Sequence, residues 1–214
     1  MGNDTNAVVL GSEDRRAVAD ALRIATGSKD RPALRSVIVA DGLAMVTDTY
    51  VAVNVPALAG LPAGAWDADA LAAATKGAGT DAVRIAPADA DTLRVDRIDG
   101  GYLRARSDAA IRQDYADGVP PAHLASTYYV GRVEGAPNVA RIYTEAVAAV
   151  TADDYAPELA AFGPERITDV LRARPSGRRK GQPAPVRIMP RGLRAAVVTD
   201  GGEPFAVVMP MREA

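Results

Sequence analysis

Apolar residues at helical spacing alternate with short apolar runs along this chain, and the combination recurs. The first helical face consists of Val18, Ala21, Leu22 and Ala25. Ser12 is a candidate N-cap for this helix, and Gly27 is a typical C-terminal stop. Three strands are expected next, near 34–40, 43–47 and 50–55. Asp41-Gly42 is a hairpin signal between the first two.

The unit of one helix followed by about three strands is predicted twice more. In the second copy, a helix from Trp66 or Asp67 to Lys76 precedes three strands. These strands are expected near 83–86, 92–95 and 102–106. The third copy begins at Gly163-Pro164, where proline suits the first helical position. Its strands are expected near 186–189, 194–198 and 205–209.

The stretch 111–158 between the second and third copies contains one more predicted helix, capped by Asn138. Short alternating strands beside amphipathic helices predict an α+β protein. We expect the helices to lie on one face of a continuous antiparallel sheet. The side chains predicted to face the strands are Val18, Leu22, Leu71, Ile142, Val147, Ile167 and Leu171.

Composition narrows the class of protein. A chain of 214 residues can form one large domain or two small ones, and 48% hydrophobic content suffices for a core. The absence of cysteine excludes disulfides and thiolate chemistry and suits a reducing cytoplasm. No signal peptide and no membrane-spanning run are indicated, so we expect a cytoplasmic protein. A net charge of −2 neither indicates nor excludes nucleic-acid binding.

The sequence offers few residues for catalysis. His123 is the only histidine, and it follows Pro120-Pro121 in a predicted connection. The acidic pairs Asp153-Asp154, Asp89/Asp91 and Asp96/Asp99 could coordinate a cation, but such pairs in turns are usually caps or solvated. No phosphate-binding loop or hydrolase motif is present. We therefore expect a binding protein without metal or cofactor; a small enzyme with a carboxylate site remains the alternative.

Two apolar segments contain the most informative pattern, 47–56 and 205–214. Met209-Pro210-Met211 is unusual because proline cannot donate to a sheet ladder and belongs at a strand end or edge. In one interpretation, the last strand simply ends at Pro210. In the other, the two flexible thioethers border an adaptable apolar surface for partner peptides.

Three stretches resemble a known family in the same order along the chain. The terminal Val207-Val208-Met209-Pro210-Met211-Arg212 resembles the end of the bacterial β sliding clamp, the processivity factor of the replicative polymerase. Arg31–Val37, Asp41-Gly42-Leu43 and Thr47–Tyr50 resemble the start of its central domain. Leu159–Ile167 resembles the entry to the second half of its last domain. The resemblance covers most of 12–110 and 159–212.

The resemblance implies a protein that encircles DNA, with helices toward the phosphates and sheets outside, and that holds short peptides of its polymerase in an apolar pocket. The pocket residues it implies are Leu34, Thr47, Thr49, Tyr50, Ala52, Val207, Met209, Pro210, Met211 and Arg212. The alternative is that these residues pack as an interdomain core. Tyr50 stands where the family often has histidine, and Thr49 where it usually has glycine, so the pocket should be narrower or differently gated.

Candidate DNA contacts lie on the predicted helices and in one basic loop. The helical candidates are Arg16, Arg23, Lys76, Arg166 and Arg172, although Asp20 weakens the Arg16/Arg23 stripe. Arg178, Arg179 and Lys180 lie in the Pro/Gly-rich loop 174–183. That loop is either a solvated connection or a phosphate-contacting segment.

We interpret the chain as a shortened, phage-encoded clamp-like processivity factor, with a central-type domain at 1–118 and a truncated last-type domain at 119–214. The resemblance does not extend to the clamp's first domain or to several strands of its last, and both departures bear on whether a ring closes. The expected partners are DNA polymerase, other proteins with clamp-binding motifs, duplex DNA and further copies of the chain. A clamp mimic that occupies the same partners without encircling DNA is the alternative.

Overall fold

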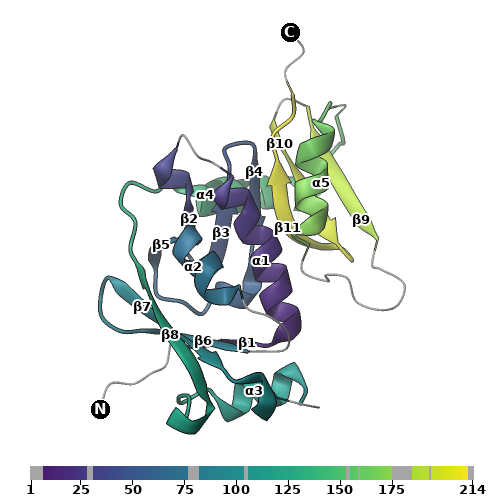
Figure 1. Cartoon of the computed structure of the whole chain (residues 1–214). Coiled ribbons are helices and arrows are strands. Elements are labelled where there is room, and N and C mark those ends of the chain that lie inside the picture. The colour runs from purple at the N-terminus through teal and green to yellow at the C-terminus, as the bar shows by residue number, and fades with distance from the viewer. Residues whose placement is uncertain are drawn as a thin grey trace.

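Two antiparallel sheets, packed with helices, organise the fold (Figure 1). The computed structural model describes residues 7–27, 31–76, 82–103, 106–152, 155–158, 160–174, 185–192 and 194–211. The helices are α1 (Ser12–Thr26), α2 (Ala68–Thr75), α3 (Asp108–Asp114), α4 (Val139–Thr151) and α5 (Pro164–Arg172), with short 3₁₀ turns η1 (Pro32–Leu34), η2 (Pro56–Leu58), η3 (Gly100–Tyr102) and η4 (Pro121–His123).

The strands form a four-stranded sheet, β1-β6-β7-β8, and a seven-stranded sheet, β5-β2-β3-β4-β11-β10-β9. Their bounds are β1 Val8–Leu10, β2 Ser36–Ala40, β3 Leu43–Thr47, β4 Val51–Asn54, β5 Gly64–Asp67, β6 Val83–Pro87, β7 Thr92–Ile98, β8 Leu124–Gly131, β9 Val186–Arg191, β10 Arg194–Asp200 and β11 Glu203–Val208. The α+β class with antiparallel sheets is confirmed.

Local sequence signals explain several element boundaries. Asp41 and Gly42 have φ of 52° and 75°, as a tight hairpin between β2 and β3 requires. The Asp67 carboxylate accepts the N–H groups of Asp69 and Ala70 at 2.8 and 3.0 Å and so caps α2. Asn138 caps α4 in the same way, through the N–H of Arg141 at 3.1 Å. The predicted starts of these helices are therefore close to those observed.

The predicted cap of α1 is wrong. Gly11 is the N-cap residue, and Ser12 already belongs to the helix. At the N-terminal end of α1, a carboxylate from α3 accepts one of the free backbone N–H groups instead. Asp108 accepts the N–H of Glu13 at 3.2 Å. Asp108 is 95 residues from Glu13 in the sequence, so the residues around α1 contain no signal for this contact.

A repeat of one strand, one helix and three strands builds residues 8–131, where α3 interrupts the second copy between β7 and β8. It runs through β1-α1-β2-β3-β4 and again through β5-α2-β6-β7-β8, and α5-β9-β10-β11 follows the same order without a leading strand. The strand predicted at 102–106 is not seen at its described residues, since Tyr102 belongs to η3, where Asp99 accepts the N–H of Gly101 at 2.8 Å; residues 104 and 105 lie outside the described residues. The sequence interpretation missed β1, β5, α3 and β8. The predicted domain boundary at 118/119 stays a prediction, and β8 lies beyond it while pairing with β7.

The main core lies between the two sheets. Val18 and Leu22 of α1, Leu71 of α2 and Trp66 of β5 are fully buried there. Ile167 of α5 packs against the same cluster. Helices α1, α2 and α5 therefore share one face of the seven-stranded sheet, as predicted for these helices. The prediction of one continuous sheet is wrong, because β1, β6, β7 and β8 pair with one another in a separate sheet.

Helix α4 lies on the opposite face of that sheet, contrary to the prediction for this helix (Figure 1). Its buried stripe is Val139, Tyr143, Ala146 and Val150, with Val147 packed beside it. The strands explain this, because β2, β3, β4, β10 and β11 contain unbroken apolar runs. Such runs are apolar on both faces and need cover on both.

Two predicted core residues are exposed instead: Ile142 at 48% and Leu171 at 41%. Ile142 lies off the buried stripe of α4, and Leu171 lies off the α5 face formed by Ile167 and Val170. None of the described helices has the length and apolar character of a membrane span.

Candidate functional site

The two segments singled out in the sequence lie side by side in the seven-stranded sheet. β4 pairs with β11, with Val51 opposite Val208 and Ala52 opposite Val207. One residue further, the N–H of Met209 donates to the carbonyl oxygen of Tyr50 at 2.7 Å. Pro210 has no N–H, so the ladder stops, and Met211 donates instead to the carbonyl oxygen of Ala161 at 2.8 Å. Residues 209–211 thus leave β4 and turn toward the segment before α5.

An exposed apolar surface forms where this ladder ends. Tyr50, Met209 and Met211 are 51%, 40% and 56% exposed. We call these three side chains the β4–β11 patch. Leu34, in η1, and Pro210 are half-buried, and Thr49 is exposed. The patch is the exposed apolar part of the predicted pocket residues that the structure describes.

Other predicted pocket residues form the sheet beneath rather than an accessible wall. Thr47, Ala52 and Val207 stand opposite one another on β3, β4 and β11, and all three are buried. Ala52 and Val207 belong to the apolar cluster that α4 covers. Arg212 lies outside the described residues. Whether a peptide binds here stays a prediction.

The loop from Thr47 to Tyr50 is tightly bonded. The Thr47 hydroxyl donates to the carbonyl oxygen of Val51 at 2.8 Å, and one Asp48 carboxylate oxygen accepts the N–H groups of Tyr50 and Val51, each at 2.9 Å. Thr49 has φ of 93°, a region that β-branched residues rarely adopt. Glycine would relieve that strain.

Two arginines contact this loop from different elements. Arg31 donates to the Thr49 hydroxyl at 2.9 Å. Arg166, on the first turn of α5, forms an ion pair with the second carboxylate oxygen of Asp48. Its guanidinium also lies 4.7 Å from the centroid of the Tyr50 ring. Arg166, predicted to contact DNA, is therefore engaged at the edge of the patch.

Three further predicted DNA contacts lie on α1 and α5, and Lys76 follows the last residue of α2. Arg16, Arg23, Lys76 and Arg172 are exposed. Arg23 pairs with Asp20 at 3.2 Å, and Arg172 with Asp169 at 3.8 Å. Arg178, Arg179 and Lys180 lie outside the described residues. Among those described, the charge on the side of α1, α2 and α5 is mixed rather than uniformly positive.

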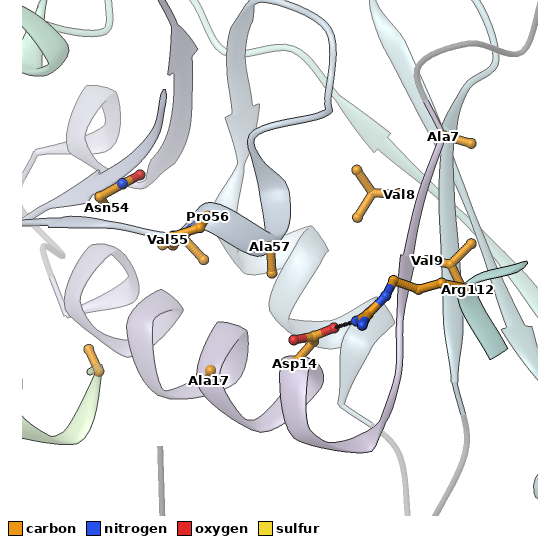
Figure 2. A pocket seen from close by; sticks show the side chains of 11 residues that line it. Ala7, Val8, Val9, Asp14, Ala17, Asn54, Val55, Pro56, Ala57 and Arg112 are labelled. Carbon is orange, nitrogen blue, oxygen red and sulfur yellow. Dashed lines mark hydrogen bonds and ion pairs between the residues drawn. The ribbon is translucent and has the colours of Figure 1, made fainter. Parts of the chain in front are cut away.

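A cleft of about 480 Å³ opens elsewhere, between β1, α1, η2 and the C-terminal end of α5 (Figure 2). Its lining is mostly apolar, from residues such as Val8, Val55 and Ala57. Asp14 and Arg112 form an ion pair of 2.6 Å at one side. Burial raises the pKa of Asp14, against the opposing influence of Arg112. Nothing in the sequence pattern indicated this cleft, because its walls come from distant segments.

The candidate residues for chemistry have structural partners. His123 stacks on Tyr102 with ring centroids 4.0 Å apart, and its Nδ1 lies 3.2 Å from the Tyr115 hydroxyl. Asp96 is buried and accepts hydrogen bonds from Arg94 at 2.9 Å and Thr127 at 2.7 Å. The carboxylate of Asp89 accepts the N–H of Asp91 at 2.9 Å, while Asp153 and Asp154 lie outside the described residues. Within the part of the chain that the structure describes, no three metal-ligating side chains cluster.

Comparison with known proteins supports the fold. No protein-family profile matches the sequence, and no match was found among curated proteins. Among solved structures, the chain is similar to DNA polymerase III subunit beta from Borrelia burgdorferi, determined in complex with a natural product. The TM-score is 0.50 at 8% sequence identity, over 100% of this chain and 66% of that one. The chain thus has a clamp-like α+β fold and spans just under two thirds of the length of that protein.

Proposed function

We propose that this chain is a clamp-like processivity factor, a binding protein rather than an enzyme. It holds peptide motifs of DNA polymerase and other replication proteins at the β4–β11 patch, and duplex DNA on the side of α1, α2 and α5. The similarity of fold to a DNA polymerase III subunit beta supports the general class. A phage origin stays a prediction.

The single observation behind the peptide site is the junction of Tyr50 with Met209. Two segments that are far apart in the sequence meet there, and the patch that they form is apolar and exposed. Burying one Leu or Phe anchor of a peptide yields roughly 1.5–3 kcal/mol. Two such anchors supply roughly 3–6 kcal/mol, whereas micromolar binding needs about 8 kcal/mol after association costs, so the peptide must also make backbone and further side-chain contacts with the protein.

A clamp mimic that binds the same peptides without DNA is the second candidate. One observation favours it: Arg23 and Arg172 on the proposed DNA side are paired with Asp20 and Asp169. Such pairing lowers the positive potential available to phosphates. Mass measurement in solution separates the two, because a ring requires several copies of the 22.2 kDa chain.

Fluorescence anisotropy with a labelled clamp-binding peptide tests the peptide site. We expect micromolar affinity for the parent protein and about tenfold weaker binding for Met211→Ala, since the thioether side chain no longer packs on the peptide. Ile142→Ala is the matched control, because Ile142 is equally apolar and exposed but lies on α4. Thermal melting checks the fold of both variants. No measurable affinity in the parent protein, or equal losses in both variants, would refute the peptide site.

A further inference from the structure

The edge of the β4–β11 patch is held in place from α5. Arg166 uses its guanidinium twice, in an ion pair with Asp48 and against the face of the Tyr50 ring at 4.7 Å. Arg166 and Asp48 are both only partly exposed, whereas the ring of Tyr50 is half exposed. An exposed aromatic ring would ordinarily sample several rotamers. Here the guanidinium of Arg166 covers one face of the Tyr50 ring, and the ion pair with Asp48 holds that guanidinium in place.

We propose that Arg166 is a positioning residue for peptide binding: it fixes Tyr50 as a rigid wall of the patch. The proposal rests on the proposed function and deepens it, because it makes α5 the element that sets the shape of the peptide site. Arg166 then serves the peptide site rather than DNA.

The loop that carries Tyr50 supports this role. Its backbone is constrained by the Asp48 carboxylate, which bonds the N–H groups of Tyr50 and Val51 with one oxygen and Arg166 with the other. The Tyr50 carbonyl oxygen is also the acceptor for Met209. Arg166, Asp48, Tyr50 and Met209 therefore form one connected chain of contacts from α5 to the end of β11.

The energetic consequence is preorganisation. A Tyr50 ring that Arg166 already fixes loses little conformational entropy when a peptide binds, because that entropy is already lost in the free protein. Without Arg166, ordering one such side chain weakens binding by about 2- to 12-fold. The planar guanidinium matters, because a lysine keeps the charge for Asp48 but stacks less well on a ring.

A double-mutant cycle on peptide affinity tests the proposal. Arg166→Gln should weaken binding several-fold in the parent protein and change nothing in a Tyr50→Ala background, because Arg166 acts through the ring. Arg166→Lys should be intermediate. Arg141→Gln is the matched control, since it removes an exposed arginine from α4, outside the proposed peptide and DNA surfaces, and it should bind the peptide as the parent does.

Equal losses from Arg166→Gln in both backgrounds would mean direct contact or general destabilisation, and would overturn the proposal. So would no loss in the parent protein. If the parent protein binds no peptide, the proposed function fails, and side-chain NMR still decides the positioning role. Three-bond couplings of Tyr50 should report one χ1 rotamer in the parent and averaging in Arg166→Gln. A single rotamer in both would overturn it.

Discussion

The Tyr143 hydroxyl donates a hydrogen bond of 2.6 Å to the carbonyl oxygen of Pro204, joining α4 to the start of β11. This bond fastens α4 to the face of the seven-stranded sheet that the other packed helices leave open. Burial raises the pKa of the Tyr143 phenol to about 12. The neutral hydroxyl is therefore the form that the folded protein stabilises.

Tyr143→Phe should lower the free energy of unfolding by about 1 kcal/mol near neutral pH, the usual contribution of one hydrogen bond. The raised pKa gives the effect a pH dependence. Below the unfolded pKa of about 10 the Tyr143 contribution is complete, and it is lost as pH rises toward 12, because the unfolded phenol ionises first. Urea denaturation of both proteins from pH 7 upward measures this. A constant difference across that range would contradict it.

Thr49→Gly should stabilise the fold by about 1 kcal/mol. Strained backbone of this kind costs of order 1–3 kcal/mol, and glycine relieves it at an entropic cost of roughly 0.5–1 kcal/mol. Thr49→Ala is the control, since it removes the hydroxyl that bonds Arg31 but keeps the Cβ. Alanine should not stabilise the protein. Denaturant midpoints distinguish the two; a destabilised glycine variant would mean that the Arg31 hydrogen bond outweighs the strain.

Leu22→Ala and Ile142→Ala should differ sharply in stability, although the sequence pattern assigns both side chains to the core. Leu22 is fully buried, so its truncation should cost about 2–5 kcal/mol. Ile142 is 48% exposed and should cost less than about 1 kcal/mol. Thermal melting of the two variants checks this. Comparable losses would mean that α4 turns Ile142, rather than Tyr143 and Ala146, toward the sheet.

Arg16→Glu with Arg23→Glu should weaken binding to duplex DNA and reduce the slope of log affinity against log salt by about one for each phosphate that is no longer neutralised. Arg141→Glu is the control, because Arg141 is exposed on α4, across the sheet from α1. It should leave DNA binding unchanged. Filter binding over a salt series measures both. If the parent protein shows no salt-dependent binding at low ionic strength, the clamp mimic is the better description.

Much of the fold follows from local patterns. Helical spacing in α1 and α4, the Asp41-Gly42 turn and the caps Asp67 and Asn138 all depend on neighbouring residues. Their energetics involve only the first turn or two, so the sequence contains the whole signal. β8 was missed because its residues, from Leu124 to Gly131, lack clean alternation and follow a run expected to form a connection.

What the sequence by itself determined is the α+β class, the repeated helix-and-strand units and the two apolar segments, 47–56 and 205–214, that meet at Tyr50 and Met209. Only the tertiary structure shows which face of the seven-stranded sheet α4 covers. Strands that are apolar on both faces can pack against a helix on either face, so their sequences do not indicate which helix covers which face. The tertiary structure also shows that Arg166 pairs with Asp48 and stacks on Tyr50. An arginine in a helix carries the same charge wherever it points, and its partner is selected by packing between segments far apart in the chain.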